Sequence, residues 1–545
     1  MAAAIQSCYQ RSGENRRSFF IVSKTAAKQK EYGDFQTPAA LAQNVVSLVA
    51  KLFGTPDTVV EPTCGQGAFL LAAIQQWENT ANYFGFELNS EHIKDAHAKL
   101  AQMDDNVRIS QSDCFLEDWK SVFDTLGKGN KRKILVLGNP PWATNSALSK
   151  VESQNLPPKT NFQRLRGLDA LTGKANFDIA EWLILQLLGA LPENAVFAML
   201  CKTSTARKVL RHIWKTRDGL TDSRLYLINA KTSFGVAVDA CLFTTTLRPT
   251  KERVAALYES LDAPIASRRL GLAGGDLVSD IDAYRRHQHF DGGNINYSWR
   301  SGVKHDASAI MELERDARFY RNALGEEVAL EDTFVYPLLK SSDIGNGRST
   351  PRKFVLVPQS FTGDDTTKIR DTAPRTWEYL NRHADVFAKR GSSIYKNRFP
   401  FSVFGVGSYT FAPWKVAISG LYKTFHFVLI PPLGNRPVLL DDTCYALSCR
   451  NEEEARLTHE LLTSKPALEF LRSLVFTDSK RPVTADILRR LSISELAHEL
   501  GRYETLESII RNADGYERSN PQFLFLMEPK PLTTPTLIWS DTPAI

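Results

Sequence analysis

The chain has 545 residues, of which 43% are hydrophobic and 23% are charged. This is the composition of a globular protein long enough to bury a full core, which excludes global disorder, collagen-like repeats and small disulfide-stapled scaffolds. Lys and Arg number 67 against 61 for Asp and Glu, a formal net charge of +6, which permits a polyanionic partner without requiring one.

The N-terminal residues and the cysteines bear on location and on metals. Residues 1–30 carry six basic residues and one acidic residue, Glu14, with no apolar segment for secretion. We expect a flexible basic arm; a transit peptide and a start codon placed too far upstream are the alternatives. The seven cysteines include no CxxC pair, which favours a reducing, cytoplasmic compartment and predicts neither a disulfide framework nor a metal site. No apolar run reaches the ~18–20 residues of a membrane span, so no membrane partner is expected.

In the first half of the chain, short β-rich runs alternate with helical stretches. The expected strands are Thr58–Glu61, Asn82–Glu87, Val107–Ser110, Ile134–Gly138, Ala195–Leu200, Leu225–Asn229 and Ala240–Thr246. The expected helices are Ala68–Glu78, Glu91–Met103 and Phe177–Leu191. This alternation predicts an open, mostly parallel α/β sheet, in which ligands bind beyond the carboxyl ends of the strands.

The pattern changes near Arg248-Pro249-Thr250, where we place a domain boundary close to residue 250. The following part is richer in Gly, Pro and aromatic residues. It contains short expected strands and two amphipathic helices: Lys353–Val357, Lys415–Ser419, Glu452–Thr463 and Ala485–Glu499. A mixed α/β domain is expected from 251 to 545.

The turn after the first expected strand has the features of a ligand loop. Gly65 and Gly67 allow a close approach of the backbone, and the helix that follows offers unpaired amide groups. Neither GxxxxGK[ST] nor GxGxxG is present. Glu61 at the entrance of the loop disfavours a pyrophosphate and suits a cationic ligand.

Two further acids follow strands. Glu87 ends the second expected strand, where a carboxylate can accept both hydroxyls of a ribose, and Asp113 follows the third, where it can accept from an adenine amino group. Each acid taken alone is a solvated loop residue. Together with Glu61 and the glycines, they predict a site for a nucleoside that carries a positive centre.

A second site follows the fourth expected strand, at Asn139-Pro140-Pro141-Trp142. The prolines fix the backbone and remove its donors. The Asn139 side-chain carbonyl and the Pro140 backbone carbonyl can then accept both hydrogens of one amino group. Trp142 offers a flat face to a planar ring, and such stacking contributes roughly 1–3 kcal/mol. The alternative is a rigid turn.

These residues resemble the gamma-class, amino-type N6-adenine DNA methyltransferases, which use S-adenosylmethionine. The similarity spans about residues 31–248 and begins with Tyr32-Gly33-Asp34-Phe35-Gln36-Thr37-Pro38. It implies a Rossmann-like S-adenosylmethionine-dependent methyltransferase domain over 31–250 and a mixed α/β target-recognition domain over 251–545. It also implies a catalytic role for Asn139, Pro140, Pro141 and Trp142, with Phe234 as a second aromatic residue on the target base.

The resemblance also supplies a set of cofactor residues. These are Thr37, Glu61, Cys64, Gly65, Gly67, Glu87, Asp113, Cys114 and Asn139. The sequence departs from the family at Glu61, where many members have Asp, and at Cys114, where some carry an aromatic or apolar residue. Whether Cys114 or Phe115 contacts the cofactor adenine stays open.

DNA contacts are expected in two places. One is the long polar segment 143–176, with Lys159, Arg164 and Arg166. The other is Lys396 and Arg398, which alternate with Tyr395 and Phe399 beside Lys389 and Arg390, although a solvated charged face fits that patch equally. Further similarities to the target-recognition region lie in scattered segments, for which scaffold turns are the simpler interpretation: Leu338–Ile344, Phe404–Tyr409, Pro413–Val416, Asp441–Thr443 and Lys480–Pro482.

The function implied is site-specific methylation of adenine N6 in double-stranded DNA, with the base extruded from the duplex. The chain is expected to be the modification enzyme of a restriction-modification pair, with a restriction endonuclease as its partner. The alternatives are a protein-glutamine or RNA N-methyltransferase, a bifunctional restriction-modification chain, and a DNA-binding module with an inactive core. The recognition sequence and the oligomeric state do not follow from the sequence.

Overall fold

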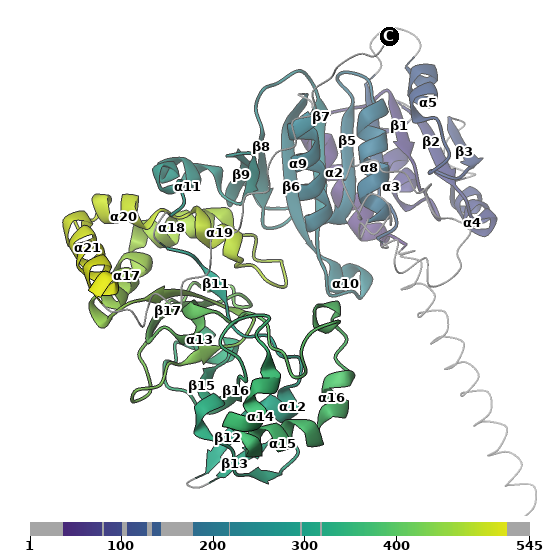
Figure 1. Cartoon of the computed structure of the whole chain (residues 1–545). Helices are drawn as coiled ribbons and strands as arrows, with labels where there is room; N and C mark the ends of the chain where they lie inside the picture. The colour runs from purple at the N-terminus through teal and green to yellow at the C-terminus, as the bar shows by residue number, and fades with distance from the viewer. Residues whose placement is uncertain are drawn as a thin grey trace, which may run out of the picture. The chain divides into compact units, whose positions relative to one another are not determined.

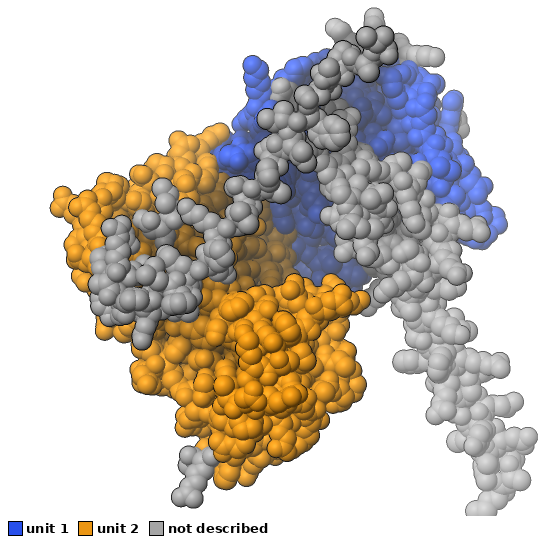
Figure 2. Space-filling view, in the orientation of Figure 1, with its two compact units in different colours: residues 1–282 blue, residues 283–545 orange. Residues whose placement is uncertain are grey.

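A computed structural model describes residues 36–78, 81–100, 106–127, 133–142, 178–216, 219–294, 297–316 and 319–519. The predicted arm 1–30, residues 32–35 and the segment 143–176 lie outside these ranges. The chain divides into two compact units, Met1–Asp282 and Ala283–Ile545 (Figure 2). No helix among the described residues has the length and apolar character needed to cross a bilayer.

The first unit is built on one ten-stranded sheet. Its strands are β1 (Thr58–Glu61), β2 (Asn82–Glu87), β3 (Val107–Gln111), β4 (Ile134–Gly138), β5 (Val196–Lys202), β6 (Leu220–Asn229), β7 (Asp239–Leu247), β8 (Val254–Tyr258), β9 (Arg268–Ala273) and β10 (Asp276–Val278). Their order is β10-β9-β8-β6-β7-β5-β4-β1-β2-β3. Strands β3, β2, β1, β4 and β5 are parallel, whereas β7 is antiparallel to β5 and β6.

Helices cover this sheet on both faces. In Figure 1, α8 (Ile179–Ala190) and α9 (Thr203–Thr216) lie in front of the sheet, and α2 (Ala39–Phe53) and α3 (Ala68–Trp77) lie behind it. Helix α4 (Ser90–Leu100) packs against α3, and α5 (Trp119–Leu126) packs against α8. Among its described residues the unit also contains α10 (Ala230–Phe234). The architecture is the doubly wound α/β fold predicted from the sequence.

The sheet extends beyond the boundary expected near residue 250. Strand β8 pairs in parallel with β6, β9 pairs antiparallel with β8, and β10 pairs antiparallel with β9. Because these three strands continue the hydrogen-bonded ladder of the first unit, the division falls after Asp282. A chain segment whose backbone is paired into a sheet belongs to that sheet, whatever its composition.

The second unit contains a four-stranded and a six-stranded sheet. The first consists of β11 (Arg300–Ser301), β20 (Cys444–Cys449), β17 (Trp414–Ser419) and β18 (Val428–Ile430). The second consists of β14 (Glu327–Val328), β13 (Phe319–Asn322), β12 (Glu312–Asp316), β16 (Lys353–Leu356), β15 (Val335–Leu339) and β19 (Leu439–Leu440). A buried apolar cluster that includes Leu339, Ala417 and Ile430 joins residues of the two sheets.

Short helices surround these sheets. The α-helices are α11 (Ile281–Arg286), α12 (Ser308–Met311), α13 (Ser341–Gly345), α14 (Ile369–Thr372), α15 (Pro374–Arg382), α16 (Ala384–Ala388), α17 (Glu452–Thr463), α18 (Lys465–Leu474), α19 (Ala485–Arg490), α20 (Ile493–Glu499) and α21 (Tyr503–Ser519). The 3₁₀ turns are η2 (Gln288–Phe290), η3 (Asp332–Phe334), η4 (Thr366–Lys368), η5 (Ser393–Tyr395) and η6 (Ser408–Phe411).

The prediction of one continuous helix over Ala485–Glu499 was wrong. The segment Ala485–Glu499 forms α19 and α20, because Ser492 lies outside helical geometry and its hydroxyl accepts a hydrogen bond from the Glu495 amide at 3.2 Å. A serine in this role starts a new helix.

Candidate active site

The candidate residues gather where the strand order of the first unit reverses. Strand β1 lies between β2 and β4, with Glu61 opposite Gly85 and Val60 opposite Val136. The chain continues from β1 outward to β2 and β3 in one direction, and to β4 and β5 in the other. Ligands of open α/β sheets bind beyond the carboxyl ends of the strands at this reversal. Glu61, Glu87 and Asn139 all lie at these ends.

The turn after β1 contains two glycines in the left-handed region of backbone conformation. Gly65 has a φ of 51°, and a Cβ atom there would meet Gln36 Oε1 at 2.6 Å. Gln36 Oε1 also accepts a hydrogen bond from the Gln66 amide at 3.1 Å. Gly67, with a φ of 77°, precedes α3. Since L side chains are strained at such angles, the backbone conformation favours glycine at both positions.

The carboxylate of Glu87 is held by two backbone amides. Oε2 accepts from the Gly65 amide at 2.9 Å, and Oε1 accepts from the Asn89 amide at 2.8 Å. His92 Nδ1 lies 3.9 Å from Oε1. An ionised carboxylate has about four lone-pair sites, so these contacts orient it and leave it able to accept further hydrogen bonds.

Glu61 lies inside the protein at the end of β1. Its residue is 3% exposed, and Oε2 accepts a hydrogen bond from the Leu70 amide at 3.2 Å, in the first turn of α3. Burial raises the pKa of Glu61 well above its ordinary value, although the Leu70 hydrogen bond acts in the opposite direction. A neighbouring cation stabilises the ionised form of such a carboxylate. This environment suits the cationic ligand that the sequence predicts.

The residues after β3 form a tight turn. Asp113 Oδ1 accepts a hydrogen bond from the Phe115 amide at 2.9 Å. Cys114 is buried, and its carbonyl accepts from Trp119 Nε1 at 3.0 Å. The Phe115 ring packs on Trp182 of α8, with ring centroids 5.6 Å apart. Cys114 thus lies in the interior, while Phe115 faces a helix of the front layer.

Cys64, in the turn after β1, is also buried. A Cβ atom on Gly85 of β2 would meet its Sγ at 3.0 Å. Burial raises the pKa of both the Cys64 and the Cys114 thiols. Both side chains therefore act as small apolar groups rather than as thiolate nucleophiles.

The loop after β4 is anchored at its first residue by two threonines. Asn139 Nδ2 donates to Thr37 Oγ1 at 3.3 Å, and Thr63 Oγ1 donates to the Asn139 carbonyl at 3.4 Å. The bond to Thr37 fixes the plane of the Asn139 amide and so directs its Oδ1 away from Thr37. Thr37, for which the sequence predicts cofactor binding, makes a direct contact with Asn139.

The two aromatic residues predicted to contact a base lie together. The rings of Trp142 and Phe234 have centroids 5.1 Å apart and planes at 70°, an edge-to-face arrangement. Phe234 ends α10, whose start is capped by Asn229 Oδ1, which accepts from the Thr232 amide at 3.0 Å. Gly235 follows with a φ of 69°. The caps at both ends of this short helix fix the place of Phe234.

Comparison with known proteins identifies the family. Residues 18–204 match the family model described as N-6 DNA methylase. The type II methyltransferase M.NspV of Nostoc sp. is 41% identical over 471 residues, which are 86% of this chain and 97% of that protein. The chain belongs to the N6-adenine DNA methyltransferase family. It is therefore a methyltransferase, and its cofactor is S-adenosylmethionine.

Two solved structures are also similar to this methyltransferase. The type IIL restriction-modification enzyme MmeI, in complex with DNA, has a TM-score of 0.47 and 12% identity, over 83% of this chain and 64% of that enzyme. The methyltransferase subunit of a type I restriction-modification system from Streptococcus thermophilus has a TM-score of 0.29 and 18% identity, over 41% of this chain and 46% of that subunit.

The observed residues of this methyltransferase fit the cofactor. A Cβ atom at Gly65 would meet the Gln36 side chain, and three acids, Glu61, Glu87 and Asp113, lie at or just beyond the carboxyl ends of adjacent parallel strands. Such acids accept from hydroxyl and amino groups and attract a positive centre. S-adenosylmethionine has ribose hydroxyls, amino groups and a positively charged sulfonium centre.

The structure describes some of the residues predicted to contact DNA, and others lie outside the described ranges. Lys159, Arg164 and Arg166 lie outside the described residues. Lys396 and Arg398 are exposed in the second unit. Arg390, expected in the same patch, instead supports the fold: its Nη1 donates to the carbonyls of His305 and Ser402 at 3.3 and 2.8 Å. Its guanidinium also lies over the Tyr395 ring, 3.7 Å from the centroid.

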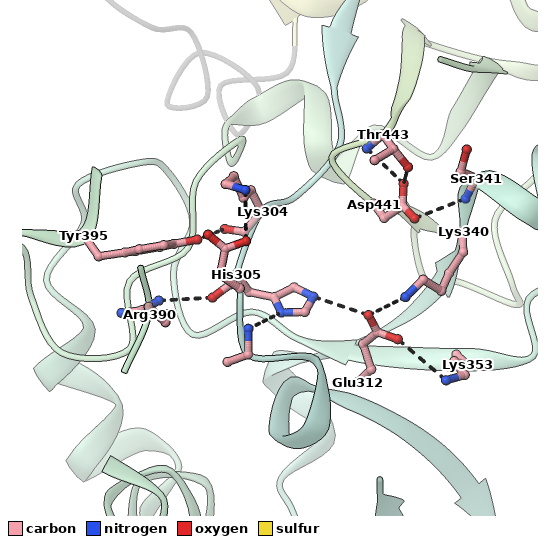
Figure 3. A network of polar contacts seen from close by, with 12 residues as sticks. Lys304, His305, Glu312, Lys340, Ser341, Lys353, Arg390, Tyr395, Asp441 and Thr443 are labelled. Atoms are coloured by element: carbon pink, nitrogen blue, oxygen red, sulfur yellow. Dashed lines mark hydrogen bonds and ion pairs between the residues drawn. The ribbon is translucent and has the colours of Figure 1, made fainter. Parts of the chain in front are cut away.

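Two of the segments that resemble target-recognition regions, Leu338–Ile344 and Asp441–Thr443, meet in one polar network of the second unit (Figure 3). Asp441 accepts from the Ser341 amide at 3.1 Å and from the Thr443 amide at 3.0 Å. Beside it, the buried Glu312 accepts from Lys340 Nζ at 2.6 Å. The Asp441 contacts hold the start of α13 to the turn before β20, and the Glu312 contact holds it to β12, which is a scaffold role.

Three residues make contacts in this methyltransferase that the sequence did not predict: Gln36, Thr63 and Lys202. Lys202 Nζ donates to the Trp142 carbonyl at 3.1 Å. The signal that could have identified Lys202 is its position at the carboxyl end of β5, because the site lies at that edge of the sheet. The expected strand ended at Leu200, two residues too early to place it there.

Proposed function

We propose that the protein is the modification enzyme of a type II restriction-modification system, which transfers a methyl group from S-adenosylmethionine to N6 of adenine at a specific site in duplex DNA. The observation that carries this proposal is the position of Asn139. Its amide, oriented by Thr37, lies at the same sheet edge as the Glu61 and Glu87 carboxylates. The family membership supports both the cofactor and the DNA substrate.

The chain's own residues are proposed to hold the amino group. The cofactor supplies an electrophilic methyl group bonded to a sulfonium centre. The Asn139 Oδ1 atom and the Pro140 carbonyl accept the two hydrogens of the target amino group and increase electron density on its nitrogen. Preorganised groups of this kind contribute ~2.7–4 kcal/mol in other enzymes. Pro141 keeps the turn rigid and adds no donor.

Trp142 and Phe234 are proposed to receive the extruded base. Without a base, their rings contact each other edge to face. Stacking a base on the Trp142 ring replaces this contact, so we infer that Phe234 shifts as the base enters. Extrusion costs a few kcal/mol, and stacking on an aromatic ring offsets roughly 1–3 kcal/mol of that cost.

We also propose that the two units have different roles. The first unit carries the residues for cofactor and amino-group chemistry, and we assign the second unit to DNA recognition, with Lys396 and Arg398 at phosphates. We propose that Lys159, Arg164 and Arg166 contact DNA as well. A restriction endonuclease that cleaves the same site is the proposed partner.

The test is methyl transfer from labelled S-adenosylmethionine to unmethylated plasmid DNA, with the product nucleosides separated. We expect N6-methyladenine, located at one short sequence. After its methylation the plasmid should resist an endonuclease that cleaves that sequence. Labelled N4-methylcytosine, or label in protein or RNA with none in DNA, would contradict the proposal.

The Asn139→Ala variant tests the mechanism. Because the amide oxygen is lost, we expect DNA methylation to fall at least a hundredfold, while the dissociation constant for S-adenosylmethionine, measured by calorimetry, changes less than fivefold. Lys465→Met, which alters an exposed side chain of α18 in the second unit paired with Glu469, is the control and should keep wild-type activity. Wild-type activity in the Asn139 variant would sink the mechanism.

A further inference from the structure

The ammonium group of Lys202 supports the last residue of the loop Asn139–Trp142, which follows β4. Lys202 is the last residue of β5, the strand beside β4, and Gly138 of β4 pairs with Met199 of β5. Its Nζ donates to the Trp142 carbonyl at 3.1 Å and to Asp178 Oδ2 at 2.9 Å. One side chain therefore connects the loop after β4 to the start of α8.

The carboxylate that neutralises Lys202 accepts three hydrogen bonds in all. The Asp178 side chain is 8% exposed, and it immediately precedes α8. Its Oδ1 accepts from the Ala180 amide at 3.1 Å, and its Oδ2 also accepts from Thr205 Oγ1 at 3.2 Å. Because Ala180 belongs to α8 and Thr205 to α9, both helices fix this carboxylate.

The loop Asn139–Trp142 is thus restrained from two sides. Asn139 is held by Thr37 and Thr63, and Trp142 is held by the pair Lys202–Asp178. A buried ion pair is a weak source of stability compared with apolar packing, but its directional hydrogen bonds fix position. The Pro140 carbonyl, two residues before Trp142, takes its direction from both restraints.

We propose that Lys202 is a positioning residue for methyl transfer: its ammonium, oriented by Asp178, holds the Trp142 carbonyl and thereby the two acceptors of the loop. This inference rests on the proposed function of Asn139 and Pro140. Lys202 need not touch the cofactor or the base in order to act. Losing it misplaces the acceptors and slows the chemical step, since small displacements of positioned groups reduce rates strongly.

The chain offers a matched control for Lys202. Lys208 on α9 forms an ion pair with the buried Glu181 of α8, Nζ to Oε2 at 3.2 Å. This pair also joins α8 to α9, but Lys208 is in the middle of α9 rather than at the end of a strand beside the loop. Lys202→Met and Lys208→Met each replace an ammonium by an apolar chain of similar length.

The experiment compares single-turnover methylation of plasmid DNA by the full-length variants, together with dissociation constants for S-adenosylmethionine and for DNA. We expect Lys202→Met to slow the single-turnover rate tenfold to a hundredfold, with both dissociation constants within threefold of wild type. Lys202→Arg should recover part of the rate, because a cationic donor remains. Lys208→Met should stay within twofold in every quantity. Equal effects of the two Met variants, or a loss confined to DNA affinity, would refute the proposal.

Amide hydrogen exchange separates this inference from the proposed function. We expect faster exchange in a peptide covering 134–142 for Lys202→Met, with wild-type exchange for Lys208→Met. If the wild type methylates no DNA, the proposed function fails, and the exchange result still decides whether Lys202 anchors the loop. Unchanged exchange in Lys202→Met would overturn the anchoring role even in an active enzyme.

Discussion

Lys415 is a buried lysine in the second unit, and its replacement should stabilise the protein. It lies on β17 and is 3% exposed, and its Nζ donates to the Ala412 carbonyl. Burial lowers the pKa of Lys415 to about 7, with a smaller opposing effect from Cys449. The perturbation is Lys415→Met, which keeps the length of the side chain and removes its charge.

The magnitude follows from the difference between the folded and unfolded pKa of Lys415. Lysine in an unfolded chain has a pKa of ~10.4, and a tenfold change in a protonation constant corresponds to ~1.4 kcal/mol. At pH 7 the lowered pKa therefore costs folding roughly 4 kcal/mol. Methionine removes this cost, but it leaves the Ala412 carbonyl without its donor and packs imperfectly, which together offset about 2 kcal/mol. We expect a net stabilisation of roughly 2 kcal/mol at pH 7.

The pH dependence has a defined sign. The pKa of Lys415 is lower in the folded protein than in the unfolded chain. The wild type is therefore most stable, relative to Lys415→Met, above pH ~10.4, and it loses stability as the pH falls toward 7. The measurement is thermal unfolding of both proteins from pH 6.5 to 9.5. At pH 7 we expect the melting temperature of Lys415→Met to be several degrees above that of the wild type, because ~1 kcal/mol shifts a melting temperature by ~2–4 °C in a unit of this size. At pH 9.5 the cost of burying Lys415 falls to roughly 1 kcal/mol, below the offset of about 2 kcal/mol, so the difference in melting temperature should close and reverse slightly. A lower melting temperature at pH 7, or a gap that does not change with pH, would refute the reasoning.

Two further predictions concern one residue in each unit. Glu61→Gln keeps an acceptor for the Leu70 amide and removes a buried carboxylate, so we expect an unchanged or higher melting temperature with at least a tenfold rise in the dissociation constant for S-adenosylmethionine; unchanged affinity by calorimetry would contradict the role assigned to the charge. Gly302→Ala would drive a Cβ atom into the carbonyls of Leu440 and Asp441, which are backbone atoms that cannot rotate away. We expect a loss of about 2–4 kcal/mol, measured by thermal unfolding, with Gly391→Ala, where the added Cβ meets open space, as the neutral control.

The parts of the fold that the sequence predicted correctly are those fixed by local pattern. The apolar runs 58–61 and 134–138 are strands because their residues are buried on both faces of a parallel sheet. Acids and Asn139 directly after such runs had to lie at the same edge. The strands β8 to β10 were missed because they are short and only partly buried, so their sequences carry weak periodicity.

The parts that the sequence did not predict depend on register. The contact between Lys202 and Trp142 exists because β5 lies next to β4 and continues to Lys202, and neither fact follows from either segment alone. Arg390 was expected at a surface, but its guanidinium reaches the His305 and Ser402 carbonyls. Long basic side chains enter such internal roles through their partners, which sequence patterns do not specify.

Gln36 and Thr37 give the enzyme a property that neither has alone. Gln36 accepts from the amide of Gln66 in the glycine turn, and its neighbour Thr37 accepts from the side-chain amide of Asn139. The loop that we assign to the methyl donor and the loop that we assign to the methyl acceptor are therefore connected through two adjacent residues. We expect a change that displaces one loop to displace the other. Adapting this enzyme to a bulkier cofactor analogue through the glycine turn should therefore also alter its binding of the base.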